Sequence, residues 1–307
     1  MKILIVGPGA MGCLFAARLS RAGIDTFLLD HDKKRAEEIA GQGIIVHDIS
    51  GNYTVKVPIA TEPQNPPDAI LICVKSGKTN DAAESIKRII TEDTLVATLQ
   101  NGLGNVEILE EILGKNKKIT GGVTSEGATL LGTGKIRHAG AGDTVLGEKE
   151  NTGDVISAII DALNMAGFKA SSSSRIDDLI WGKLIVNAGI NALTAITGLK
   201  NGRLTEFRGS LNILKNAVNE AVAVSKAAGI NLPYDDPVAR VLEVCRATEH
   251  NIASMLQDVL NKRMTEVDFI NGAICRAGEK SGIPTPVNRM LTDIVKTIES
   301  SYYERIV

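Results

Sequence analysis

The chain has 307 residues, of which 44% are hydrophobic, 3% are aromatic and 23% are charged, and its formal net charge is -2. A chain of this size can bury a large core, which usually divides into two domains. The near-neutral charge and the scarcity of aromatic residues exclude the basic, base-stacking surface that nucleic-acid binding needs. The N-terminus starts directly with a strand pattern and no apolar run approaches about 20 residues, so we expect a cytoplasmic protein without a membrane span.

The first segment predicts a dinucleotide-binding turn. Residues 2–6 form an apolar, β-branched strand, Gly7-Pro8-Gly9-Ala10-Met11-Gly12 follows, and an apolar helix continues to Gly23. In this setting G-x-G-x-x-G gives a tight turn, a close backbone approach and a helix N-terminus directed at a pyrophosphate. All six residues of the turn are therefore candidate cofactor-binding residues.

Asp30 ends the second predicted strand, residues 26–29, where an acidic side chain would hold the ribose 2′-hydroxyl of NAD. A carboxylate there repels the 2′-phosphate of NADP, but the basic residues His31, Lys33, Lys34 and Arg35 follow and could neutralise one. The residues alone leave the choice between NAD(H) and NADP(H) open.

Two later segments, residues 68–74 and 94–99, are continuous apolar strands typical of a parallel sheet buried on both faces. The first ends at Lys75 and the second at Gln100-Asn101-Gly102. Ligands of open α/β sheets bind beyond the carboxyl ends of the strands, so Lys75 and Asn101 are candidate cofactor contacts. Asn-Gly is also a common turn, and only the position favours the binding interpretation for Asn101.

Shorter strand patterns complete the first domain. Residues 44–46 and 53–57 alternate like a small hairpin joined by residues 48–52, which we interpret as a decoration of the sheet. Further strands are predicted at residues 119–123 and 144–146. Ala128 lies between these two strands and is a further candidate cofactor contact.

The pattern changes after a predicted helix at residues 155–165. Ser171-Ser172-Ser173-Ser174 is expected to form a turn into the next helix, and strand patterns stop there. The predicted fold class is therefore α/β, with a Rossmann-type parallel sheet domain at residues 1–172 followed by an all-helical domain at residues 173–307. The apolar helix faces of the second domain also lead us to expect a homodimer. The predicted helices cover residues 179–197, 211–228, 236–243, 254–279 and 289–299.

The helix within residues 179–197 carries an unusual polar face. Lys183, Asn187 and Asn191 follow at i, i+4 and i+8 inside an apolar run, so they share one side of the helix. Lys is almost never fully buried without a partner, and Asn has a mediocre helix propensity. A solvated helix face would explain such a stripe, but the apolar residues around it leave little room for an exposed helix. The face is a candidate site.

A second polar group lies in the predicted helix of residues 254–279. Ser254 and Glu266 are twelve positions apart, or about 18 Å along an unbroken helix, so one small ligand could not touch both without the cofactor spanning that face. Alone, Ser254 is more typical of an N-cap and Glu266 of a solvated charge. The four cysteines and four histidines lack paired ligand spacing, and we expect packed thiols and no metal site.

Taken together, these stretches resemble the ketopantoate reductase family, also called 2-dehydropantoate 2-reductases. The resemblance covers nearly the whole chain. Its most specific parts are Ser254-Met255-Leu256-Gln257-Asp258 and residues 265–272, Thr-Glu-Val-Asp-Phe-Ile-Asn-Gly, together with the Lys183 helix and Asn201-Gly202. The resemblance implies NADPH-dependent reduction of a 2-oxo acid, 2-dehydropantoate, to pantoate for coenzyme A biosynthesis.

The same resemblance implies roles for individual residues. Lys183 would be the general acid and Glu266 would contact the cofactor, while Asn101 would touch both cofactor and substrate. The substrate would be held by Asn187, Asn191, Asn201 and Ser254. Asn251 is the next candidate for the substrate carboxylate if Ser254 serves only as a helix cap. A cation beside the keto oxygen can supply both the proton and charge stabilisation, which fits the role of Lys183.

Many members of the family carry an arginine where this chain has Asp30, so NADH is an alternative cofactor.

Two other functions compete with ketopantoate reduction. The nearest rival enzyme is another NAD(P)-dependent reductase of a 2-oxo acid or a β-hydroxyacid dehydrogenase. A non-enzymatic NAD(P) sensor is the rival from another class, but such a protein would have no use for Lys183 with Asn187 and Asn191.

Overall fold

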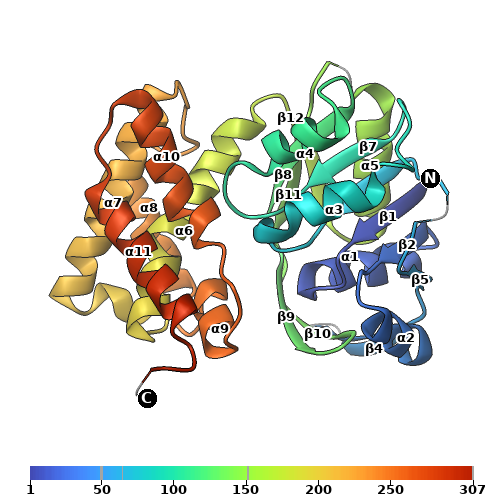
Figure 1. The fold of residues 1–307 in the computed structure, drawn as a ribbon, viewed down its shortest axis with the longest axis horizontal. Coiled ribbons are helices and arrows are strands. Elements are labelled where there is room, and N and C mark those ends of the chain that lie inside the picture. Colours follow the sequence, from blue (N-terminus) through green and yellow to red (C-terminus); the bar gives the residue numbers. More distant parts are fainter. Residues whose placement is uncertain (49–50, 64, 151, 306–307) are drawn as a thin grey trace. The chain divides into compact units, whose positions relative to one another are not determined.

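The computed structural model describes residues 1–48, 51–63, 65–150 and 152–305. The chain divides into two compact units, of which the first holds residues 1–100 and 105–176 and the second residues 101–104 and 177–307. Figure 1 shows strands in the blue to green part of the chain and only helices in its orange to red part. The sequence places the boundary at residues 172 and 173, and the structure places it four residues later and adds residues 101–104 to the helical unit.

The first unit is built on a large, mainly parallel sheet. Its strands are β1 (Lys2–Val6), β2 (Asp25–Leu29), β5 (Ile59–Ala60), β6 (Ala69–Ile72), β7 (Leu95–Thr98), β8 (Lys118–Thr124), β11 (Asp143–Gly147) and β12 (Lys169–Ser173). In the described chain the order is β12-β11-β8-β7-β6-β1-β2-β5, and only β8 and β11 pair antiparallel. The chain leaves β1 for β2 on one side and returns to β6 on the other, which creates the switch point where such sheets bind ligands. The predicted α/β class is confirmed.

Helices cover both faces of this sheet because its central strands are apolar on both sides. Ile3 and Ile5 of β1 pack with α1 (Ala10–Arg21) and α5 (Gly153–Met165) in one core. Leu4 and Val6 face the opposite core, which includes α3 (Thr79–Ile86) and α4 (Asn105–Leu113). Two further elements follow the carboxyl ends of strands. They are helix α2 (Lys33–Gln42) after β2 and the short 3-10 turn η1 (Ser76–Lys78) after β6.

The predicted hairpin is half of a second sheet rather than a decoration. Strands β3 (Ile44–Asp48) and β4 (Gly51–Val55) pair antiparallel as expected, and β10 (Lys135–Gly140) then pairs with β3 and with β9 (Gly127–Gly132). Residues 49 and 50 of the connection lie outside the described residues. The alternation of Ile136 and His138, both buried, with exposed neighbours was the available signal for β10.

A buried cluster of charges fastens this second sheet to α1. The two ring nitrogens of His138 face carboxylates on either side, with Nε2 2.6 Å from Oε2 of Glu126 and Nδ1 3.0 Å from Oδ1 of Asp48. Arg18 of α1 donates to Oδ2 of Asp48 at 3.3 Å. Because His138 and Glu126 are 3% and 8% exposed, their polar atoms depend on these partners rather than on water.

The second unit consists of helices around one apolar core. They are α6 (Ile176–Thr197), α7 (Arg208–Ala227), α8 (Pro237–Ala247), α9 (Ser254–Leu260), α10 (Asn271–Ser281) and α11 (Pro286–Ser300), with 3-10 turns η2 (Gly202–Thr205) and η3 (Val267–Phe269). Leu184, Ile185 and Ala188 of α6 are among the most buried residues of this core. The expected all-helical second domain is confirmed.

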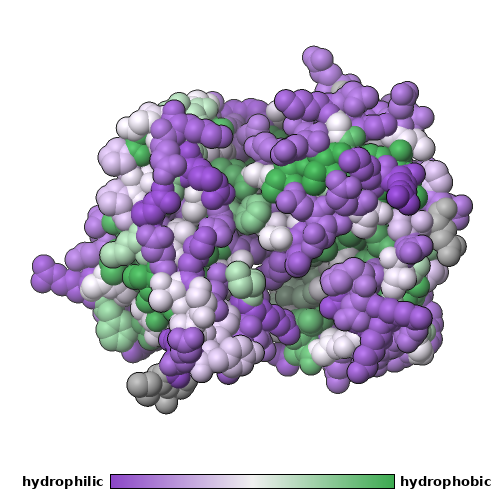
Figure 2. All heavy atoms as spheres, in the orientation of Figure 1, coloured by the Kyte–Doolittle hydropathy of each residue, from purple (hydrophilic) through white to green (hydrophobic). Residues whose placement is uncertain are grey.

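Helix α6 begins at Ile176, three residues before the predicted helix of residues 179–197. Its 22 residues are sufficient, by length and composition, to cross a membrane, but 67% of its most apolar stretch is buried inside the structure. In Figure 2 hydrophilic residues predominate on the visible face, and hydrophobic residues gather only in smaller areas. We therefore interpret α6 as the core helix of its unit.

Two predicted elements were wrong. Only Ser174 lies in the predicted turn, because Ser171, Ser172 and Ser173 belong to β12, an edge strand whose side chains tolerate exposure while its backbone pairs with β11. The predicted helix of residues 254–279 is broken into α9, η3 and α10. Lys262 has a left-handed backbone with φ of 52°, which ends α9, so the 18 Å separation expected between Ser254 and Glu266 does not apply.

We predict that Glu126→Ala lowers the free energy of unfolding by about 1–3 kcal/mol, because it leaves the buried Nε2 of His138 without its hydrogen-bond partner. Urea unfolding followed by circular dichroism measures the change. The control is Glu84→Ala, since Glu84 lies in an exposed pair with Lys87 at 3.5 Å and should change stability by about 0–1 kcal/mol. Equal effects of the two substitutions would show that the buried cluster does not stabilise the unit.

Candidate active site

The turn after β1 has the backbone geometry that its glycines allow. Gly7 has a φ of +97°, and a Cβ on it would lie 2.5 Å from Cγ1 of Val74. A Cβ on Gly12 would lie 1.9 Å from the carbonyl oxygen of Gly7, so the turn and the first helical turn close on each other. These two glycines are therefore required by the packing of the protein itself.

Gly9 is different, because no protein atom stands in its way. The nearest neighbour of a Cβ on Gly9 would be the carbonyl oxygen of Cys73 at 3.9 Å. Gly9 is the N-cap of α1 and has no capping side chain, and the first turn of α1 carries no acidic residue. An open backbone surface at an uncapped helix N-terminus fits a pyrophosphate. The partly exposed Ala10 and Met11 adjoin it, while Pro8 is buried and its carbonyl oxygen accepts from Cys13.

Asp30 does not present a free carboxylate at the end of β2. Its side chain is fully buried, and Arg35 of α2 donates to both of its oxygens, through Nε at 2.6 Å and through Nη2. The backbone N–H of Asp32 donates to Oδ1 as well, at 3.1 Å. Pairing with Asp30 raises the pKa of Arg35, whose side chain is 36% exposed. This edge therefore offers to solvent the exposed part of Arg35, together with the more exposed His31 and Lys33.

The loops after β6 and β7 are held together by Gln100, a residue that the sequence analysis did not single out. Its Nε2 donates to the carbonyl oxygen of Val74 and to Oγ1 of Thr79, both at 2.9 Å. Thr79 is itself bonded to Asn105 at 2.9 Å. This clamp fixes the exposed Lys75 at the carboxyl end of β6, in the predicted position.

Ala128 lies at the second position of β9, opposite His138 of β10, and packs against the core that contains α1. The charge cluster at His138 therefore holds the segment that carries this candidate residue. A cofactor contact of Ala128 stays a prediction.

In the helical unit the expected polar face of α6 is present. Lys183 and Asn187 are partly buried and Asn191 is 7% exposed, while the remaining sides of this helix are packed in the core. Burial lowers the pKa of Lys183 to about 8, and the negative charge of Glu266 acts in the opposite direction. Lys183 can thus exchange a proton near neutral pH, which is the property that a general acid needs.

Glu266 reaches this site because the chain leaves the helical path before it. Glu266 is 5% exposed, precedes η3 and accepts from Nδ2 of Asn101 at 3.1 Å. The segment of Asn101 is tightly seated, because Leu103 donates its N–H to the carbonyl oxygen of Phe269 at 2.9 Å. A Cβ on Gly102 would lie 2.1 Å from that oxygen, and Gly102 has a φ of +89°. Asn101-Gly102 therefore forms a tight turn and also brings the Asn101 side chain to Glu266.

Asn201 and Asn251 form a second group. The backbone N–H of Asn201 donates to the carbonyl oxygen of Asn251 at 3.1 Å, and Nδ2 of Asn201 donates to Oγ1 of Thr248 at 2.9 Å. The hydroxyl of Thr248 donates to the carbonyl of Val244, so it must accept from Asn201 and fixes the amide orientation. Oδ1 of Asn201 is buried and has no partner among the described residues. This oxygen can therefore accept a hydrogen bond from a ligand.

Ser254 is not the N-cap that its position suggested. Ala253 occupies that position without a capping side chain, and Ser254 is the exposed first residue of α9. Asn251 is exposed as well. Both side chains are accessible to a ligand, and their substrate contacts stay predictions. The contacts unite Lys183, Glu266 and Asn101 in one group and Asn201 and Asn251 in another.

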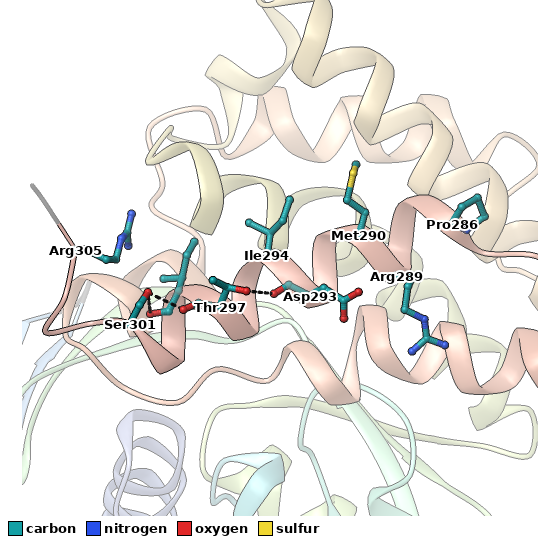
Figure 3. A pocket seen from close by; sticks show the side chains of 9 residues that line it. Pro286, Arg289, Met290, Asp293, Ile294, Thr297, Ser301 and Arg305 are labelled. Carbon is teal, nitrogen blue, oxygen red and sulfur yellow. Dashed lines mark hydrogen bonds between the residues drawn. The ribbon is translucent and has the colours of Figure 1, made fainter.

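A shallow groove of about 600 Å³ on α11 contains none of the predicted residues. Figure 3 shows Met290 and Ile294 on the lining of this groove, with Thr297 donating to the carbonyl oxygen of Asp293 and Ser301 to that of Thr297. The lining combines exposed apolar side chains with the charged residues Arg289, Asp293 and Arg305. The expected homodimer is not tested by this surface and stays a prediction.

The chain matches known family models over both units. A model described as ketopantoate reductase PanE/ApbA matches residues 3–151, and the C-terminal model of the same description matches residues 175–299. The 2-dehydropantoate 2-reductase of Halobacterium salinarum is 32% identical over 300 residues, 96% of this chain and 98% of that protein. The enzyme of the same name from Archaeoglobus fulgidus is 34% identical over 301 residues, 97% of this chain and 98% of that protein.

Solved structures that resemble this chain include a ketopantoate reductase and a D-mandelate dehydrogenase. A PanE/ApbA family ketopantoate reductase from Ralstonia eutropha superposes with a TM-score of 0.91 at 31% identity, covering 98% of this chain and 99% of that one. A ternary structure of D-mandelate dehydrogenase with NADH and anilino(oxo)acetate has the same TM-score and coverage at 30% identity.

We predict that Glu266→Gln lowers the pKa of Lys183 below about 8, because the variant removes the negative charge that favours the ammonium form while the burial remains. The pH dependence of Lys183 labelling by a small amine-reactive reagent, read by peptide mass spectrometry, measures this pKa. Glu243→Gln, on an exposed side chain, is the control and should leave it unchanged. A pKa that stays constant or rises in Glu266→Gln would contradict the electrostatic coupling.

Proposed function

The chain belongs to the ketopantoate reductase family, and from this premise we propose that it reduces the keto group of 2-dehydropantoate to give pantoate. It is an NAD(P)H-dependent oxidoreductase. The observation that carries the proposal is Lys183, a partly buried ammonium with a pKa of about 8 on the polar face of an otherwise apolar helix. A non-enzymatic NAD(P) sensor has no use for such a group.

The proposed reaction uses Lys183 as proton donor. Reduced nicotinamide, when bound, supplies the hydride to the keto carbon. The electron pair of the C=O π bond moves to the oxygen, which takes a proton from Nζ of Lys183 and becomes the product hydroxyl. Before that transfer the ammonium also stabilises the negative charge that develops on the oxygen. The neutral amine then regains a proton from water, which a pKa of about 8 allows at neutral pH.

Asn201 supports a substrate that carries an additional hydroxyl. Its buried Oδ1 is an acceptor without a partner among the described residues, and 2-dehydropantoate has a hydroxyl on C4 that can donate to it. Asn187 and Asn191 offer neutral amides that bind polar groups without cancelling the charge of Lys183. We assign the substrate carboxylate to Ser254 and Asn251, whose exposed side chains can both donate to it.

A second candidate function is the NADH-dependent reduction of another 2-oxo acid. The structural similarity to a D-mandelate dehydrogenase that binds NADH favours it. The substrates of the two candidate functions differ in whether they can donate a hydrogen bond to Oδ1 of Asn201. Phenylglyoxylate, the oxo acid that corresponds to mandelate, has no hydroxyl to give to Oδ1, so it would leave this acceptor unpaired.

We expect turnover of 2-dehydropantoate, followed by the absorbance of reduced nicotinamide, to exceed that of 3,3-dimethyl-2-oxobutanoate and of phenylglyoxylate. Loss of the C4 hydroxyl should lower kcat/KM roughly tenfold or more, since a buried acceptor is left unsatisfied at about 1–3 kcal/mol. Asn201→Ala should abolish this preference, and Lys183→Ala should lower kcat for every substrate by about 100-fold or more. Faster reduction of phenylglyoxylate would favour the second candidate, and undiminished turnover in Lys183→Ala would exclude this lysine as the acid.

We propose NADPH as the preferred cofactor, with NADH as the alternative. The family resemblance supports NADPH, and Arg35 cancels the charge of Asp30 that would otherwise repel a 2′-phosphate. The exposed part of the Arg35 guanidinium can also donate to that phosphate. Asp30 thus acts through its partner rather than as a free acceptor.

Opposite shifts in cofactor preference are expected from the two members of this pair. Asp30→Ala removes a negative charge and releases Arg35, so the affinity ratio of NADPH over NADH should rise. Arg35→Ala exposes NADPH to the uncompensated Asp30 carboxylate, so the ratio should fall by about tenfold or more. Fluorescence titration of each reduced cofactor gives Kd values without turnover, and Arg35→Lys controls for loss of charge. Equal changes in both Kd values would show that neither residue faces the 2′-position.

A further inference from the structure

Two buried asparagines of the helical unit have no role in the proposed reaction. Asn271 begins α10 and Asn288 lies in the first turn of α11, and both are 0% exposed. Nδ2 of Asn271 donates to Oδ1 of Asn288 at 3.0 Å. An amide pair in the centre of an apolar core is expensive unless its groups are satisfied, so its bonds need an explanation.

The pair joins four helices through directed bonds. Nδ2 of Asn271 also donates to the carbonyl oxygen of Ala188 in α6, at 3.1 Å. Nδ2 of Asn288 donates to the carbonyl oxygen of Ala217 in α7 at 3.0 Å and to Oε2 of Glu220 at 2.8 Å. Glu220 in turn accepts the backbone N–H groups of Val287 and Asn288, at 2.8 and 2.9 Å. Glu220 therefore fixes the orientation of the Asn288 amide, which fixes that of Asn271.

The end of this chain of bonds lies at the active site. Ala188 follows Asn187 directly on α6 and is little more than one turn beyond Lys183. Asn271 follows Glu266 by five residues, and the intervening turn is tied to Glu266 by the N–H groups of Phe269 and Ile270, each 3.0 Å from its carbonyl oxygen. The bond from Asn271 to Ala188 thus joins the helix that carries Lys183 to the segment that carries its electrostatic partner.

Another side of α6, which carries Gly182 and Gly189, is fitted closely against neighbouring side chains. Gly182 and Gly189 are seven residues apart and share one side, and a Cβ on either would lie 2.9 Å from a neighbour, Pro233 and Val218 respectively. Lys183 and Asn191 lie about 100° and 180° around the helix from Gly182. A small rotation about this glycine side would move the Lys183 ammonium relative to Glu266.

Oδ1 of Asn271 supports a role beyond stability. It is buried and has no partner among the described residues, which destabilises the core. An apolar side chain would avoid that penalty, so the amide is explained by its donor group and not by packing.

We propose that Asn271 is a positioning residue, which by its bond to the Ala188 carbonyl, oriented through Asn288 and Glu220, holds α6 at the rotation that directs Lys183 toward Glu266. This inference rests on the proposed function only in that reduction of the keto group is one of its readouts. Asn271 is 0% exposed, so the proposed role acts through α6 and not through contact with a ligand.

The test compares Asn271→Ala with Leu291→Ala. Leu291 is a buried residue of α11 in the same core, so its truncation lowers stability without touching the bond to α6. Asn271→Ala should lower kcat at least about tenfold with a smaller change in KM, and should shift the labelling pKa of Lys183 by more than half a unit. Leu291→Ala should change neither. Equal effects of both variants would overturn the proposal, because loss of packing alone would then suffice.

Two further measurements keep the outcomes separate. If Asn271→Ala does not fold, Asn288→Ala removes the orienting partner and leaves the bond to Ala188, and it should shift the same two quantities in the same direction by less. Unchanged kcat and labelling pKa in Asn288→Ala would also overturn the proposal. A parent protein that reduces no 2-oxo acid would refute the proposed function, while the labelling pKa of Lys183 would still decide the role of Asn271.

Discussion

The helical unit depends on the burial of one ammonium in its central helix. Helix α6 supplies much of the apolar core, yet it carries Lys183 among those apolar residues. A buried cation without a partner is too unfavourable to persist, and here burial already lowers its pKa to about 8. The break between α9 and α10 places Glu266 within electrostatic range of it. Interrupting a helix costs backbone hydrogen bonds. We explain the break between α9 and α10 by the negative charge of Glu266, which this break brings to the core.

The nucleotide-binding unit depends on sterics instead. Gly7 and Gly12 close the turn because a Cβ on either would overlap protein atoms, whereas a Cβ on Gly9 would meet none closer than 3.9 Å, and we propose that the cofactor uses this open backbone. The three glycines of one motif therefore have separate physical reasons. Gln100 adds a clamp between the loops after β6 and β7, so the carboxyl edge of the sheet is held by hydrogen bonds as well as by its strands. A rigid edge of this kind suits a cofactor that must be held while a reaction proceeds.

Local pattern was sufficient for the central strands of the parallel sheet, the glycine turn and the polar face of α6, but it indicated neither β5 nor β12 at the two ends of that sheet. It failed where the outcome depends on distant partners. Ser171 to Ser173 form a strand because β11 offers a pairing edge. The helix before Glu266 ends near Lys262, whose left-handed backbone is not indicated by any periodicity of the sequence. Asp30 was correctly placed at the end of β2, but its partner Arg35 comes from the following helix and reverses what the carboxylate offers to a ligand.

The charges of the site also explain why its other polar groups are neutral. A 2-oxo acid is an anion, and Glu266 alone would repel it. The Asn101 amide donates to Glu266, and the nearby Lys183 balances its charge, so the pair presents little net charge to an anionic ligand. A further carboxylate on α6 would raise the pKa of Lys183 and repel the substrate, and a further cation would lower that pKa. Asparagine at positions 187 and 191 provides donors and acceptors and leaves that balance undisturbed.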